Sequence, residues 1–155
     1  MQLTRNFTMA EVWKSTETPS TNQIRTAQML AQMILQPLRD FVGKPIIITS
    51  GKRAAAIAGG AENSEHLYLG NDGAADLNIG DHTVLINLGA FDWLAKNCLY
   101  GIGQLIWYTE TTHLHVSLAG RNQSELLVCT SQANHRYSAI KRASEIATFD
   151  KRLQA

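Results

Sequence analysis

Three residues far apart in the sequence carry side chains that suit one divalent metal ion. His66 and Asp76 lie in SEHLYLGNDGAADLNI at residues 64–79, and His115 lies in HLHVSL at residues 113–118. Zinc accepts imidazole nitrogen and carboxylate oxygen, and two histidines with one carboxylate leave a coordination position open for water. We therefore predict His66, Asp76 and His115 as a zinc site of the catalytic kind.

The HLH segment supports this interpretation if it forms a strand. Side chains alternate along a strand, so His113 and His115 would share one face and Leu114 would occupy the other. Two imidazoles on one face are difficult to explain by core packing. The alternative stays open at this point, because scattered histidines are more often solvated or hydrogen-bonded than bound to a metal ion.

The first half of the chain predicts helices. Residues 6–16 carry Thr8 and Glu11 at the spacing of a capping box. Apolar residues then recur at steps of three and four residues over 24–41, which is the period of an amphipathic helix. Pro37 is expected to bend this second helix near its end.

The second half predicts mainly strands, at residues 44–50, 73–80, 104–109, 113–118 and 124–131. Residues 82–87 extend or follow the second of these strands, and residues 110–112 form a hairpin loop. Helical spacing returns over 88–101. Helices first, followed by strands with one inserted helix, favour a single α+β domain with an antiparallel central sheet flanked by helices. Residues 1–130 are expected to form this domain, and 131–155 an appended helical tail.

Bulk properties exclude several function classes. The 155 residues carry a formal net charge of +1, so a nucleic-acid-binding surface is not expected. No apolar stretch is long enough for a membrane span, and the N-terminus does not have the pattern of a signal peptide. Cys98 and Cys129, the two cysteines, are expected to be buried thiols rather than a disulfide. Phosphate-loop and nucleophile-elbow spacings are absent from the sequence.

The order of short motifs along residues 6–118 resembles the zinc D-alanyl-D-alanine carboxypeptidase family, which includes many phage-encoded peptidoglycan peptidases. The motifs are FTMAEVW, then ILQPLRDF, SGKR, GGAENSEH, GAAD and finally HVSL. Each motif is weakly specific, whereas six in this order are strongly specific. The resemblance implies a hedgehog/D-Ala-D-Ala-peptidase-like fold, a zinc cofactor, and a peptidoglycan peptide as substrate.

Carried over by position, the resemblance again makes His66, Asp76 and His115 the zinc ligands. It makes Arg53 a substrate-binding and catalytic group that holds a peptide carbonyl or terminal carboxylate and stabilises the oxyanion. Ser64 would support the His66 loop, and Gln104 the strand before the site. The alternatives are a salt bridge for Arg53 and a loop cap for Ser64.

Two departures from the family pattern bear on activity. The segment from histidine to aspartate is about three residues longer than in relatives, and it contains Asp72 as a second candidate carboxylate. We prefer Asp76 because it begins ADLNI, where a strand would hold a ligand rigidly. The general base is the second departure: many relatives have an acidic residue at the position of Thr112. Glu110 and His113 are the two remaining candidates.

Two functions follow from these residues. The first is a zinc peptidase that is encoded by a phage and acts at the bacterial cell wall or in the virion. The second is a non-catalytic relative that retains the fold as a structural part of a phage tail or baseplate and contacts other virion proteins. The residue at Thr112, the lengthened loop and the appended C-terminal helix favour the second function, and the retained ligand set favours the first.

Overall fold

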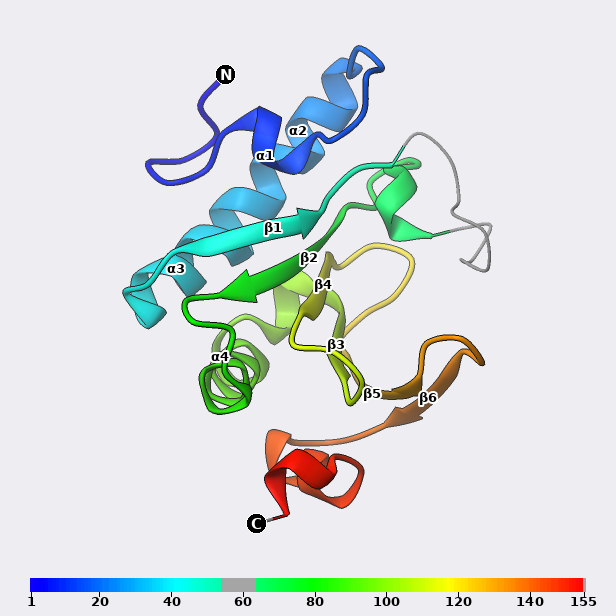
Figure 1. Ribbon diagram of the computed structural model, residues 1–155. Helices are drawn as coiled ribbons and strands as arrows, with labels where there is room; N and C mark the ends of the chain where they lie inside the picture. Colours follow the sequence, from blue (N-terminus) through cyan, green and yellow to red (C-terminus); the bar gives the residue numbers. More distant parts are fainter. Residues whose placement is uncertain (54–63, 155) are drawn as a thin grey trace.

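Six strands form one twisted sheet in the order β1-β2-β4-β3-β5-β6 (Figure 1). The computed structural model describes residues 1–53 and 64–154. Its strands are β1 (Ile46–Ser50), β2 (Ala74–Ile79), β3 (Ile102–Tyr108), β4 (Leu114–Leu118), β5 (Glu125–Ser131) and β6 (Arg136–Ala139). Neighbouring strands are antiparallel, except that β5 runs parallel to β3. The predicted α+β class with a mainly antiparallel sheet is confirmed.

The helices precede the sheet in the sequence or are inserted between its strands. They are α1 (Met9–Val12), α2 (Thr21–Leu30), the π-helical segment η1 (Ala31–Leu35), α3 (Gln36–Val42) and α4 (Val84–Asn97). Short 3₁₀ helices are η2 (Glu65–Leu67), η3 (Leu99–Gly101), η4 (Ala143–Thr148) and η5 (Lys151–Leu153). Ser20 begins α2 with a capping box, and Gly43 ends α3 in the left-handed conformation, at φ 63°. The wide π-helical turn directly precedes Pro37, whose ring disfavours regular α-helical packing against the preceding turn.

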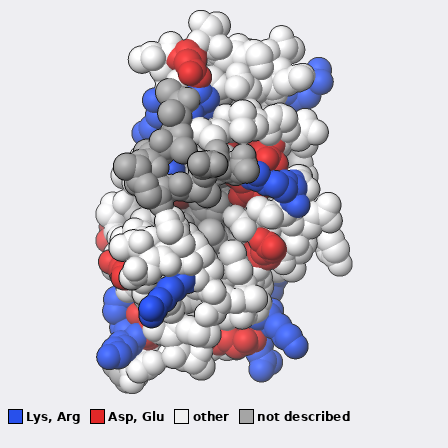
Figure 2. All heavy atoms as spheres, turned by 90° about the vertical axis from the view of Figure 1, so that its right-hand side faces the viewer, with Lys and Arg blue, Asp and Glu red and all other residues white. Residues whose placement is uncertain are grey.

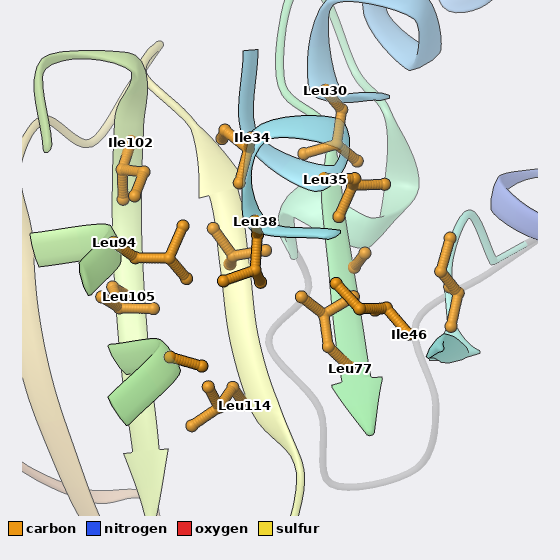
Figure 3. Close-up of a cluster of buried hydrophobic side chains, with 14 of the residues drawn as sticks. Leu30, Ile34, Leu35, Leu38, Ile46, Leu77, Leu94, Ile102, Leu105 and Leu114 are labelled. Carbon is orange, nitrogen blue, oxygen red and sulfur yellow. The ribbon is translucent and has the colours of Figure 1, made fainter. Parts of the chain in front are cut away.

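One apolar core joins the helices to one face of the sheet. Figure 3 shows leucine and isoleucine side chains of α2, η1 and α3 directed toward side chains of β2, β3 and β4, with Leu94 of α4 beside them. The labelled members are Leu30, Ile34, Leu35, Leu38, Ile46, Leu77, Leu94, Ile102, Leu105 and Leu114. Ten such side chains removed from water supply a large part of the folding free energy.

The opposite face of the sheet has a different composition. Leu105 and Trp107 of β3 belong to the helix-side core, whereas Ile106 and Tyr108 form a smaller apolar cluster with Cys129. Because side chains alternate along a strand, this second cluster occupies the face that the helices do not cover. Polar groups placed on that face can therefore be held by a rigid sheet without entering the main core.

Two local predictions are wrong. Residues 82–87 do not continue a strand: the Thr83 side chain accepts a hydrogen bond from the Ile86 amide and begins α4. The tail is not one helix, because residues 136–139 form β6 on the edge of β5. The apolar period that favoured a helix is carried instead by Ile140 and by η4, whose buried residues join the main core.

The remaining bulk expectations concern cysteines, membranes and charge. Cys98 and Cys129 are both free thiols, Cys129 fully buried and Cys98 partly so. Within residues 1–53 and 64–154, no helix has the length and apolar character required to cross a bilayer. Figure 2 shows the face of the molecule that lies on the right-hand side of Figure 1. Lys and Arg side chains are interspersed with Asp and Glu over the described part of this face.

Candidate metal centre

Asp76 and His115 are cross-strand partners in the antiparallel β2–β4 ladder. Each is flanked along its strand by residues of the helix-side core, so both side chains lie on the opposite face. The Oδ1 atom of Asp76 lies 3.0 Å from Nδ1 of His115. Residues separated by 39 positions in the sequence are thus brought together by strand register alone.

The third side chain, His66, reaches the same point from η2. Ser64 begins this short helix, and its hydroxyl accepts a hydrogen bond from the His66 amide at 3.4 Å. The His66 ring donates from Nδ1 to the carbonyl oxygen of Gly51 at 2.8 Å. Its Nε2 atom lies 3.3 Å from Asp76 Oδ1 and 3.2 Å from His115 Nδ1.

These three residues form a group whose ligand atoms all lie within 4.8 Å of one another, and all three residues are buried. Because Nδ1 of His66 donates to a carbonyl, the lone pair of the neutral ring is on Nε2, which faces the other two residues. Two imidazole nitrogens and one carboxylate oxygen at this separation match the donor set of a three-ligand zinc site. The structure therefore brings together the three residues predicted from the sequence, in a geometry that could bind a metal ion.

The carboxylate of Asp76 and the ring of His115 shift each other's pKa. Burial would raise the pKa of Asp76, but the adjacent side chains of His115 and His66 hold it well below its ordinary value. Burial would lower the pKa of His115, but its contacts with Asp76 and Glu65 outweigh this and raise the pKa to about 9. Asp76 is consequently a carboxylate at neutral pH, which is the form a metal ligand requires.

Arg53 lies at the border of this group. Its Nη2 atom is 3.2 Å from Asp76 Oδ2, and its Nε donates to the Ser50 hydroxyl at 3.0 Å. The side chain is 24% exposed. The salt bridge that was the alternative for Arg53 is thus present, and its partner is Asp76 itself. The guanidinium also remains accessible beside the candidate metal centre.

Two other predicted residues lie outside the group. Asp72, the second candidate carboxylate, pairs with Arg121 at 3.5 Å and accepts from the Arg121 amide. Gln104 donates to Glu125 at 2.7 Å and supports the β3–β5 pair. The preference for Asp76 over Asp72 agrees with this arrangement, because Asp76 alone projects from β2 toward the histidines.

The two candidate bases are placed differently by the β3–β4 loop. Glu110 is exposed, and its Oε2 accepts a hydrogen bond from the Gln132 amide on the turn between β5 and β6. His113 packs its ring against Tyr108, with centroids 4.4 Å apart, and its Nδ1 lies 2.9 Å from the Thr111 hydroxyl. Burial lowers the pKa of His113, although the charge of Asp76 opposes this change.

The loop that carries His113 is fixed at three backbone carbonyls. Arg152 of η5 donates to the carbonyls of Tyr108 and Thr111 at 2.7 and 2.8 Å, and Asn87 of α4 donates to the carbonyl of Thr112. Arg152 is held in turn by Asp150, a buried carboxylate. The C-terminal segment therefore determines the conformation of a loop beside the candidate metal centre, a role that the sequence did not reveal.

Sequence reasoning also missed Glu65. This residue is 4% exposed, and its Oε2 lies 3.6 Å from Nε2 of His115, on the side of the ring away from Asp76. Its position directly before His66 in SEH was the available signal, but an acidic residue in a loop is ordinarily solvated. The carbonyl of Gly51 gave no signal at all, because every residue has a carbonyl.

This protein is an α+β domain with a buried His-Asp-His group on the uncovered face of its sheet, which are the features of a candidate metal-dependent protein. A family model described as Peptidase M15 matches residues 5–117, and the chain belongs to this family. This match confirms, at the level of the family, the resemblance to zinc D-alanyl-D-alanine carboxypeptidases. Peptidases of this family are metal-dependent. Searches of curated proteins and of solved structures gave no match.

Proposed function

We propose that this protein is a zinc metallopeptidase that hydrolyses peptide bonds in peptidoglycan stem peptides or cross-links. The observation that carries the proposal is the convergence of His66 Nε2, Asp76 Oδ1 and His115 Nδ1 in a buried group. Membership of the peptidase M15 family supports the same function. Residues His66, Asp76 and His115 would hold Zn²⁺, which when bound supplies Lewis acidity toward a peptide carbonyl and acidifies a water molecule.

Arg53 is proposed to bind the substrate. The Ser50 hydroxyl and the Asp76 carboxylate hold its guanidinium beside the centre, where a planar group with several donors can bind a peptide carbonyl or a terminal carboxylate. The same donors would stabilise negative charge that develops on the carbonyl oxygen during hydrolysis. Ser64 acts indirectly in this proposal, by fixing the backbone of His66.

His113 is proposed as the general base that takes a proton from the attacking water and passes it to the leaving amine. The β3–β4 loop holds it next to the candidate ligand His115, and its ring is fixed between Tyr108 and Thr111. Glu110, in contrast, is exposed and bonded to the β5–β6 turn. An imidazole is the commonest side chain for general acid–base catalysis near neutral pH.

We further propose a phage origin, with action at the bacterial cell wall or in the virion. The motif order over residues 6–118 supports it, because the family that these motifs resemble includes many phage-encoded enzymes. The partner in this proposal is a peptidoglycan peptide, with other virion proteins as additional partners.

A non-catalytic virion component is the second candidate function. The observation that favours it is that Thr112 occupies the position of the usual acidic residue and that Glu110 is bonded elsewhere. Such a protein would retain the fold and the metal centre in a tail or baseplate, without turnover.

One experiment separates the two functions. The zinc content of the purified chain is measured, and the release of new amino groups from cell-wall sacculi is followed for wild type, His66→Ala and Arg136→Ala. Arg136 is exposed on β6 and serves as the control. Turnover that His66→Ala abolishes and Arg136→Ala retains supports the peptidase. Bound zinc without turnover in wild type supports the structural component.

A further inference from the structure

We propose that Glu65 is a positioning residue for His115: its carboxylate accepts the Nε2–H of that ring and so directs Nδ1 toward His66 and Asp76. This inference rests on the proposed metal centre and assigns the residue that orients one of its ligands. It concerns the chain's own side chains, so it can be tested in the metal-free protein as well as in the zinc-bound one.

The first observation is a pair of buried polar atoms that face each other. Among the described residues, Glu65 Oε2 and His115 Nε2 are both buried without a hydrogen-bond partner. They lie 3.6 Å apart, slightly beyond hydrogen-bonding distance. A buried polar atom without a partner costs about 1–3 kcal/mol, so a shift of a few tenths of an ångström that joins these two atoms is favourable.

The second observation is that the rest of Glu65 is already fixed. Its Oε1 accepts a hydrogen bond from Asn122 Nδ2 at 3.1 Å, across 57 positions of the sequence. Asn122 lies in the connection between β4 and β5, so a segment far from η2 in the sequence holds the carboxylate. With one oxygen bound there, the other is left to face the His115 ring.

The third observation is the orientation of the two imidazoles. His66 presents Nε2 to the group, because the Gly51 carbonyl accepts its Nδ1–H. His115 presents Nδ1, so its Nε2 must carry a proton if the neutral ring is to have its lone pair on the metal side. A carboxylate can only accept, so Glu65 holds a proton on Nε2 of His115. Nδ1, whose proton the Asp76 carboxylate accepts in the metal-free protein, is then the nitrogen that is available to a metal ion.

The test compares Glu65→Gln with wild type and with Glu145→Gln, a matched change on η4. Glutamine keeps the size of the side chain but offers one oxygen and one NH₂, so it cannot accept from both His115 and Asn122. The zinc dissociation constant is measured by competition with a chromophoric chelator. We expect Glu65→Gln to weaken zinc binding by about 10–100-fold, the usual effect of losing a carboxylate that orients a ligand histidine. Glu145→Gln should bind zinc as wild type does.

A second measurement uses metal-free, ¹⁵N-labelled wild-type protein. We expect His115 Nε2 to carry a proton whose exchange with water is slow, and its resonance to shift in Glu65→Gln. A His115 Nε2 that carries no proton in wild type, or whose proton exchanges rapidly with water, overturns the inference even if the variant fails to fold. If wild type binds zinc and Glu65→Gln binds it equally tightly, the inference is wrong and the proposed function stands. If wild type binds no zinc, the proposed function fails, and the ¹⁵N measurement still decides the role of Glu65.

Discussion

Asp76 and His115 face each other across two interior strands of the sheet, with Oδ1 and Nδ1 3.0 Å apart. Both β2 and β4 are paired on each side, so neither residue can move away without disruption of the sheet. The relative position of these two side chains is therefore as rigid as the strand register. Such rigidity favours metal binding, because little conformational entropy is lost when the ion binds.

Asp72 of the lengthened loop and Asp76 of β2 allow a matched test of the ligand assignment. Asp76→Asn should reduce zinc affinity by more than the roughly 10–100-fold effect of losing an outer partner, because it removes a ligand oxygen and a negative charge. Asp72→Asn should retain the wild-type affinity, since Asp72 pairs with Arg121 instead. Zinc titration of both variants measures the difference, and an equal loss in both would refute the assignment.

The β3–β4 loop separates the two candidate proton-transfer groups. If His113 transfers the proton, His113→Ala lowers kcat for a stem-peptide substrate by about 10²–10⁴-fold while zinc stays bound. Glu110→Gln is then expected to have a much smaller effect on kcat. The opposite order of the two variants assigns the role to Glu110, and it would require the loop to rearrange when substrate binds.

The buried carboxylate of Asp150 provides a pH-dependent contribution to stability. Burial would raise its pKa, but hydrogen bonds from Arg152 and Trp107 lower it below the ordinary value. A lowered folded-state pKa means that the stabilisation is fully present above the unfolded pKa, about 3.9, and is lost as pH falls through the folded value. Asp150→Asn should lower the free energy of unfolding by about 1–3 kcal/mol at neutral pH.

The pH dependence distinguishes this contribution from a simple packing change. The difference between wild type and Asp150→Asn, measured by urea denaturation, should become smaller as pH falls below about 4. Asp92→Asn is the control, because Asp92 forms an exposed helical pair with Lys96. That variant should change stability by only about 0.3–0.5 kcal/mol. A difference for Asp150→Asn that is constant with pH would contradict the role of its charge.

Two glycines should respond in opposite directions to alanine. A Cβ on Gly51 would collide with the backbone carbonyl of Val12, and Gly51 also supplies the carbonyl that holds His66. Gly51→Ala is therefore expected to destabilise the protein by about 1–3 kcal/mol and to weaken zinc binding. Gly89 lies in α4 with open space around its Cβ position. Gly89→Ala should stabilise the protein by about 0.5–1 kcal/mol, and thermal unfolding measures both changes.

The sequence predicted what depends on local pattern. The capping box of Thr8 with Glu11, the apolar period from 24 to 41 and the strand that contains His115 each depend on a few neighbouring residues. His113, which alternation in HLH placed on the same strand, instead precedes β4 and lies in the β3–β4 loop. The His-Asp-His group was also predictable, because few residue types supply zinc ligands and the motif order indicated which of them converge. The structure agrees with these inferences because local preference and tertiary packing favour the same arrangement there.

What the sequence did not reveal depends on distant partners. The strand β6 forms because the edge of β5 is available, whereas the apolar spacing around Ile140 and Ile146 also fits a helix. The parallel pairing of β5 with β3 is likewise set by the path of the whole chain. Glu65 resembles any loop glutamate until the fold places Asn122 on one oxygen and His115 opposite the other. No pattern among neighbouring residues of the sequence predicts these contacts.

The three candidate ligands differ in the kind of element that carries them. Asp76 and His115 belong to the interior of the sheet, while His66 belongs to a three-residue 3₁₀ helix held by Ser64 and Gly51. An ion bound here would accordingly leave by way of His66, since only that imidazole can swing aside without breaking strand pairing. The lifetime of the bound ion would then be set by the opening rate of one short helical turn.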